Sequence, residues 1–295
     1  MLNLFCRLRS GLFLFATFVL LASASAADQG SAVYRVSDGD RQLYLGGTIH
    51  LLRQSDYPLP AAFEQAYADS GIIALETDMG AVNDPSLQMR MMEQVTYQDG
   101  RTLRSVLNDE AYTALENHLA EAGLPMQMVE NFKPGLLMTT LSVLEFQKLG
   151  FTPQGVDMFY FTRAMGDGKA MRELEPVEAQ IEMLASMGEG YESEYVLYSL
   201  EDFENSADSI EELVRVWREA DLDAMEEVFI EPMREMSSEL YEDILVTRNH
   251  AWVPVIEELM QEAETVFVLV GAAHLPGADG LLTLLSDRGY SIEPL

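Results

Sequence analysis

The sequence predicts an α/β protein in which the N- and C-terminal segments form a central mixed sheet, with a large and mostly helical middle between them. Three observations predict this fold. Short apolar, β-branched runs occur near both ends, apolar residues recur at helical spacing in the middle, and a glycine-rich turn joins the last long apolar run to a short helix. The chain has no repeat of fixed period and no low-complexity linker, so we expect one domain over residues 27–295.

The N-terminal end carries three predicted strands. Residues 32–36 and 42–45 flank the turn-rich tetrad Ser-Asp-Gly-Asp and predict a hairpin. A helix is expected around residues 63–68. The run at 71–75 is short and apolar, which is typical of a strand buried on both faces, and Glu76 follows it directly.

The middle of the chain, from about residue 84 to 264, shows apolar residues at spacings of three and four and is divided by glycine and proline into segments of helix length. Residues 169–174 form a candidate strand within it. At the C-terminal end, residues 265–270 predict a strand, 281–285 a helix and 290–293 a last strand.

Composition restricts the class of partner. The chain of 295 residues has 49 Asp and Glu against 18 Lys and Arg, a formal net charge of −31, and 48% hydrophobic residues. The hydrophobic content is sufficient for a substantial core. The negative charge argues against nucleic acid or an anionic membrane surface as a partner, and it does not exclude a peptide or small-molecule substrate, the class of partner expected below.

The first 26 residues predict a signal peptide. Arg7 and Arg9 precede an apolar stretch at 11–21, and Ala24-Ser25-Ala26 provides the small residues of a cleavage site. The apolar stretch is shorter than the ~20 residues of a membrane span. We therefore expect cleavage near Ala26 and a periplasmic or secreted protein without a membrane anchor. The single cysteine, Cys6, lies in the predicted leader, which excludes a disulfide or thiolate nucleophile from the mature chain.

Two histidines follow predicted strands in the same local motif, Gly-x-x-His. One runs from Gly47 to His50 and the other from Gly271 to His274. A glycine just after a strand allows a sharp turn and leaves room for a ligand near the backbone. Both histidines would then project from the carboxyl ends of strands, where open α/β sheets bind ligands. The alternative for each is a histidine that merely caps the turn between strand and helix.

Glu76 adds a carboxylate at the same predicted edge of the sheet. Two histidines and one carboxylate with an open position are a known catalytic set for zinc or another divalent ion, such as manganese or cobalt. Such an ion lowers the pKa of its bound water to ~7 and polarises a carbonyl, which is hydrolytic chemistry. Glu76 is either a ligand or the general base; alternatively it forms an ion pair with an arginine. Of the other histidines, His118 is expected at an exposed helical position, and the spacing of His250 indicates no role.

These motifs together resemble the TraB/GumN family, which includes the animal Tiki proteases. The matching segments are, in family order, Gly47 to His50, Glu76, Gln154-Gly155-Val156-Asp157, Arg248-Asn249 with Trp252, and the glycine-rich stretch 271–285. The resemblance implies an α/β core related to erythromycin-esterase and haem-binding ChaN-like proteins. By analogy with Tiki it also implies a metal-dependent peptidase that uses the two histidines and the glutamate.

Three further residues are assigned supporting roles. Arg248 is expected to bind a carboxylate, either near Glu76 or at a substrate terminus, unless it is a surface arginine. Asp157 is expected to orient a ligand histidine, with a plain helix N-terminal carboxylate as the alternative. Asn249 is expected to donate a hydrogen bond to a developing oxyanion.

The resulting hypothesis is a periplasmic metallohydrolase, peptidase-like, with His50, His274 and Glu76 at the metal. Two alternatives remain open. One is a protein that binds haem, a metal or a peptide without turnover, and the other is a metal-independent esterase in which a histidine acts as base alone. The residues do not distinguish peptide, ester and lactone substrates.

Overall fold

The computed structural model describes residues 31–295 apart from residue 205, so the predicted signal peptide at 1–26 lies outside the described residues. A six-stranded sheet has the order β4-β3-β5-β2-β1-β6. Its strands are β1 (Val33–Asp38), β2 (Arg41–Thr48), β3 (Ile72–Leu75), β4 (Ala170–Glu173), β5 (Val266–Gly271) and β6 (Ser291–Pro294). Strands from the two ends of the chain therefore build most of one mixed sheet, which confirms the predicted fold class.

The order of the strands sets the position of the candidate site. Strands β2, β5, β3 and β4 run parallel, whereas β1 is antiparallel to both β2 and β6. The C-terminal strand β5 lies between two N-terminal strands, with Thr48 of β2 opposite Gly271 and Leu75 of β3 opposite Leu269. Because parallel strands end at the same edge, the segments after β2, β3 and β5 meet there.

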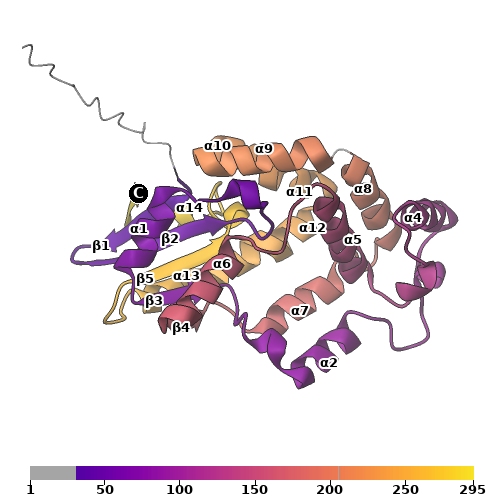
Figure 1. Ribbon diagram of the computed structural model, residues 1–295, viewed down its shortest axis with the longest axis horizontal. Coiled ribbons are helices and arrows are strands. Elements are labelled where there is room, and N and C mark those ends of the chain that lie inside the picture. Colours follow the sequence, from indigo (N-terminus) through magenta and orange to yellow (C-terminus); the bar gives the residue numbers. More distant parts are fainter. Residues whose placement is uncertain (1–30, 205) are drawn as a thin grey trace, which may run out of the picture.

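The helices lie between the strands in the chain and pack beside the sheet (Figure 1). Helix α1 (Ala61–Asp69) links β2 to β3, and α14 (Leu281–Asp287) links β5 to β6. The helical middle contains α2 (Pro85–Gln94), α3 (Leu103–Val106), α4 (Asp109–Glu121), α5 (Pro134–Lys148), α6 (Val156–Asp167), α7 (Val177–Ser186), α8 (Glu192–Glu204), α9 (Ser206–Glu219), α10 (Leu222–Met225), α11 (Glu231–Met236), α12 (Ser238–Tyr241) and α13 (Thr247–Leu259). Two π-helical turns, Glu226–Ile230 and Glu242–Val246, lie between α10 and α11 and between α12 and α13.

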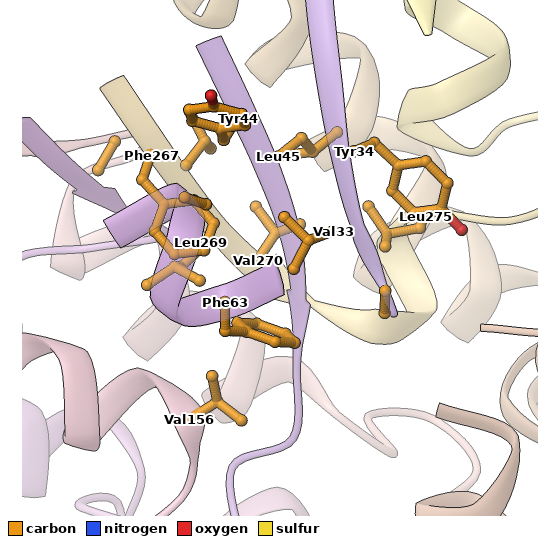
Figure 2. Packing of buried hydrophobic residues seen from close by; sticks show 14 of the residues in the cluster. Val33, Tyr34, Tyr44, Leu45, Phe63, Val156, Phe267, Leu269, Val270 and Leu275 are labelled. Carbon is orange, nitrogen blue, oxygen red and sulfur yellow. The ribbon is translucent and has the colours of Figure 1, made fainter. Parts of the chain in front are cut away.

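The main hydrophobic core joins the sheet to the helices next to it. Figure 2 shows part of this cluster, including Val33 of β1, Phe63 of α1 and Phe267 of β5. The rings of Phe63 and Phe267 are 6.2 Å apart, and Trp217 and Trp252 are the largest side chains with no exposed surface. A second cluster is formed by α4, α5 and α8 away from the sheet. The sheet and its carboxyl edge therefore rest on a core of their own.

Most predicted elements agree with the structure. The hairpin, the strand before Glu76, the candidate strand at 169–174 and the last two strands are confirmed, each within three residues at its ends. The expectation for His118 was wrong: its side chain in α4 is 20% exposed and its Nε2 lies 3.2 Å from Glu145, because α4 packs on α5 and α8. No helix within the described part of the chain is long and apolar enough to cross a membrane.

Candidate active site

Three predicted residues meet at the carboxyl edge of the sheet. His50 follows β2, Glu76 follows β3 directly, and His274 lies in a 3-10 turn (Ala272–His274) after β5. A Cβ atom built on Gly271 would lie 3.3 Å from Oε1 of Glu76, 3.5 Å from Cδ2 of His274 and 3.8 Å from Nε2 of His50. The three side chains thus surround one small space above Gly271, and the glycine keeps that space open.

Glu76 is a largely buried carboxylate whose two oxygens both accept hydrogen bonds. The Gly271 amide donates to Oε1 at 2.7 Å, Arg248 donates to Oε2 at 2.7 Å, and Gln180 of α7 donates to Oε2 at 3.1 Å. Burial acts to raise the pKa of Glu76, but His274, Arg248, His50 and the Gly271 amide outweigh it and hold the pKa at about 2. The carboxylate is therefore charged at neutral pH.

His274 is buried and held in one tautomer. Its Nδ1 lies 2.6 Å from Oδ1 of Asn249, and its Nε2 lies 3.2 Å from Nη1 of Arg248. Because a guanidinium only donates, Nε2 carries the lone pair and Nδ1 the proton. Burial lowers the pKa of His274 to about 3, and the positive charge of Arg248 acts in the same direction. The imidazole is therefore neutral at neutral pH.

Asn249 belongs to the support of His274. Its Nδ2 donates to the backbone oxygen of Asp279 at 2.7 Å and more weakly to that of His274 at 3.4 Å. Both ends of the amide are thus engaged, and the side chain has no exposed donor to offer an oxyanion, the role expected from the sequence.

His50 is the exposed member of the cluster. Its Nδ1 lies 2.8 Å from Oδ2 of Asp157, and its side chain is 68% exposed. Asp157, at the start of α6, also accepts a 2.5 Å hydrogen bond from Thr48 of β2. The Asp157 carboxylate raises the pKa of His50. With Nδ1 directed at Asp157, Nε2 is the nitrogen that faces the space above Gly271.

Arg248 of α13 provides the buried positive charge. Besides Glu76 and His274 it contacts Glu175, with Nη2 2.7 Å and Nε 3.1 Å from Oε1. The guanidinium carbon lies 4.4 Å from the centre of the Trp252 ring, and the side chain is 12% exposed. Arg248 is therefore not a surface arginine, and the carboxylate that it binds nearby is Glu76 itself.

Two residues of the cluster were missed by the sequence analysis. Glu175 lies two residues after the end of β4 and also accepts a hydrogen bond of 3.0 Å from Nε1 of Trp252. A signal was available, because Leu174-Glu175 at the end of the candidate strand repeats Leu75-Glu76 at the end of β3. Gln180, one turn into α7, had no comparable signal, since only packing brings it to Glu76.

The glycines of the motifs permit close backbone contacts. A Cβ atom on Gly155 would lie 2.3 Å from the carbonyl carbon and oxygen of His50, and Val156 donates to the oxygen of Ile49 at 3.0 Å. The segment Gln154-Gly155-Val156-Asp157 is thus docked on the first Gly-x-x-His turn, which brings Asp157 to His50. A Cβ atom on Gly47 would lie 2.6 Å from Cδ1 of Leu275, so this glycine lets the two turns pack together.

The donor set fits a divalent ion in kind. Two imidazole nitrogens and a carboxylate are ligands that zinc, manganese and cobalt accept, and they converge above Gly271. In the arrangement seen, Arg248 donates to Nε2 of His274, and no group of three or more His, Cys, Asp or Glu in residues 31–204 and 206–295 is spaced to hold an ion. Ligation by His274 therefore requires Arg248 to move away from Nε2.

Comparison with known proteins is consistent with this geometry. A family model, the TraB/PrgY/gumN family, matches residues 32–294. The chain belongs to the TraB/PrgY/gumN family. The match confirms the resemblance and spans both Gly-x-x-His motifs, Glu76 and Arg248. The protein YbaP of Escherichia coli (strain K12) is 23% identical over 252 residues, which cover 84% of this chain and 89% of YbaP. No solved structure matches the chain.

Proposed function

We propose that this TraB/PrgY/gumN family protein is a periplasmic or secreted hydrolase, peptidase-like, with its active site at the cluster around Gly271. One observation carries the proposal: Oε1 of Glu76, the ring of His274 and Nε2 of His50 surround a single open space at the carboxyl edge of the sheet. Ligands of open α/β sheets bind at this edge. The resemblance to Tiki supports a peptide substrate, and the predicted leader supports the location.

A divalent metal ion, zinc, manganese or cobalt, is part of this proposal, with His50, His274 and Glu76 as its ligands. The ion would supply an activated water and polarise the substrate carbonyl. The chain prepares both imidazoles in the same way. Asn249 fixes the proton of His274 on Nδ1, and Asp157 accepts from Nδ1 of His50, so that in each neutral ring Nε2 is the nitrogen that would bind the ion, in His274 once Arg248 has moved away from it.

A metal-independent hydrolase is the second candidate, and a specific contact favours it. Arg248 lies 3.2 Å from Nε2 of His274 and 2.7 Å from Glu76, so a guanidinium already supplies the positive charge of the site. The exposed His50, oriented by Asp157, would then act as the general base toward water. Its deprotonated form is the active one in this scheme.

Elemental analysis of the purified protein, with peptide hydrolysis measured on the same samples, tests both candidates. The metal-dependent proposal expects a near-stoichiometric divalent metal that is lost in His50→Ala and His274→Ala but retained in His250→Ala. His250 is an exposed histidine of α13 and serves as the matched control. Each variant is checked for folding by circular dichroism, since loss of metal through unfolding would support a structural role of the histidine.

The remaining outcomes are distinct. Hydrolysis that survives a chelator, without metal after loading with zinc, manganese or cobalt, would support the second candidate. Absence of both metal and hydrolysis would contradict the hydrolase proposal and favour a binding protein. Titration with haem, followed by visible absorbance, then tests the haem-binding version of that alternative.

A further inference from the structure

A cavity of about 470 Å³ opens next to the candidate active site, at the carboxyl ends of β3 and β4. It is lined by Leu75, by the loop residues 77–79, by Phe161 of α6 and by residues 171–173 of β4. Glu76 lies between two lining residues in the chain. The cavity therefore lies at the same carboxyl edge of the sheet as Glu76, and its volume is sufficient to hold part of a peptide.

One wall of this cavity is the open edge of the sheet. Strand β4 is the last strand, and it pairs with β3 alone among the described strands (Figure 1). The amide of Leu174 donates to the backbone oxygen of Leu75 in β3 at 3.0 Å. Because the backbone groups of successive residues in a strand point alternately to its two sides, the backbone groups of Arg172 also face β3, and those of Met171 and Glu173 face away from the sheet. All four residues of β4 are exposed. The Met171 carbonyl already accepts a hydrogen bond from Nη1 of Arg172 at 3.0 Å, so the strand presents the amides of Met171 and Glu173 and the carbonyl of Glu173 to a further strand.

The side chains around the cavity favour one class of substrate residue. Leu75, Met79, Phe161 and Met171 form an apolar part of the lining, while Asp78 and Glu173 add carboxylates at its rim. Neither carboxylate has a cation partner in the described part of the chain. The lining arginine, Arg172, is paired with Glu262 at 2.8 Å. A side chain with an apolar stem and a cationic end matches this combination.

Thr77 gives an independent indication of an unfilled site. Its Oγ1 is buried and has no hydrogen-bond partner. A buried hydroxyl without a partner is costly, and a bound backbone amide or carbonyl would satisfy it. Thr77 is one of the residues that line the same cavity.

We propose that β4 binds an extended segment of a polypeptide substrate as an added strand, with a lysine or arginine side chain in the adjoining cavity. Backbone pairing would supply affinity and the cavity would supply specificity, as in other cases of strand addition. The inference rests on the proposed hydrolase function for its meaning as a substrate site. It selects an extended basic peptide over the ester and lactone substrates that the sequence left open.

The test measures binding of a peptide and not its hydrolysis, so that failure of this proposal can be distinguished from failure of the hydrolase proposal. The probe is the fluorescein-labelled peptide Ala-Thr-Val-Lys-Val-Thr-Ala, titrated with full-length mature His50→Ala protein and followed by fluorescence anisotropy. We expect binding of this peptide, about tenfold weaker binding when its lysine is replaced by glutamate, and loss of binding when alternate backbone amides are N-methylated. Wild-type protein is assayed in parallel for cleavage by mass spectrometry.

Variants of the protein test the two halves of the proposal separately. Met171→Pro removes an amide that faces away from β3 and should abolish binding, whereas Met171→Leu keeps the amide and should bind as before. Asp78→Asn with Glu173→Gln should remove the preference for lysine over glutamate. Glu116→Gln, on the exposed face of α4, is the control for a change of charge and should preserve the preference.

Several results would overturn the proposal. Equal binding of the N-methylated peptide, or undiminished binding by a folded Met171→Pro, would exclude strand addition. A lysine preference that survives Asp78→Asn with Glu173→Gln would exclude the cavity as its source. Lack of binding of every peptide by the wild-type protein would overturn both halves, whereas binding without cleavage would contradict only the hydrolase proposal.

Discussion

Nη1 of Arg248 lies 3.2 Å from Nε2 of His274. The guanidinium that contacts this neutral imidazole also lies 2.7 Å from two buried carboxylates, Glu76 and Glu175. One cation therefore serves two anions, and it adds to the effect of burial, which lowers the pKa of the histidine beside them. The charge balance of the site depends on a residue of α13 that is distant in the chain from every strand end that it contacts.

Arg248→Met should destabilise the protein strongly. The substitution preserves much of the volume but leaves Glu76 and Glu175 buried without their cation, and loss of one partner of a buried pair costs about 3–5 kcal/mol. Urea unfolding at pH 7 measures the loss. Arg248→Lys keeps a positive charge, so its free energy of unfolding should lie between those of the wild type and Arg248→Met. A free energy of unfolding that is unchanged in Arg248→Met would contradict this account of the site.

His274 should make the protein less stable in acid. Its pKa is about 3 in the folded protein against 6.5 for an ordinary histidine, so the unfolded chain takes up the proton first as the pH falls. Stability from this group is complete above pH 6.5 and is lost progressively down to about pH 3. In metal-free protein the drop between pH 7 and 5 should be smaller in His274→Gln, by about 2 kcal/mol.

The control for this pH dependence is His250→Gln, which changes an exposed histidine of the same region. It should retain the full drop of the wild type. If His274→Gln loses as much stability between pH 7 and 5 as the wild type does, then the neutral imidazole is not the source of the acid sensitivity.

Gly271→Ala should disable the site without unfolding the protein. The φ of Gly271 is −51°, which alanine adopts readily, but the new methyl group would lie 3.3 Å from Oε1 of Glu76 and would fill the space between the histidines. We expect metal content and peptide hydrolysis to fall at least about tenfold, with a thermal midpoint near that of the wild type. Gly166→Ala, which has open space around its Cβ, is the control and should affect neither. Retention of full activity in Gly271→Ala would place the reaction elsewhere.

Gly155→Ala should act on stability. A Cβ atom at this position would lie 2.3 Å from backbone atoms of His50 and Ile49, which have no flexible end to move aside. Such overpacking costs about 1–3 kcal/mol, and the contact between Asp157 and His50 should be disturbed with it. Thermal unfolding measures the first effect. The imidazole resonances of His50 in NMR report the second, and an unshifted spectrum would contradict it.

Local pattern was sufficient to predict the residues that follow strands. Glu76 comes directly after a short apolar run. His50 and His274 each lie three residues beyond a glycine that ends such a run. Predicted strands and the geometry of parallel strand ends therefore placed all three at one edge of the sheet. The mixed sheet itself was predicted from the short apolar, β-branched runs near both ends and from the glycine-rich turn that leads from the last long run to a helix.

Packing between helices was not predictable from pattern. Gln180 contacts Glu76 only because α7 lies against the sheet edge, and His118 is covered because α4 packs on α5 and α8. Helical periodicity specifies a face of a helix, but not the helix that it meets. Glu175 was predictable but was not predicted. The rule that identified Glu76, a carboxylate at the end of a predicted strand, also applies to Glu175 at the end of the candidate strand.

The position of β5 between β2 and β3 bears on how the protein is made. During synthesis β2 and β3 leave the ribosome before β5, the strand that pairs with both, has been translated. The whole helical middle is also synthesised before β5. Pairings between distant parts of a chain form slowly, and strand edges promote aggregation as long as they remain unpaired. The two Gly-x-x-His turns can therefore meet only after nearly the entire polypeptide has left the ribosome, so no N-terminal fragment ending before β5 can carry the assembled site.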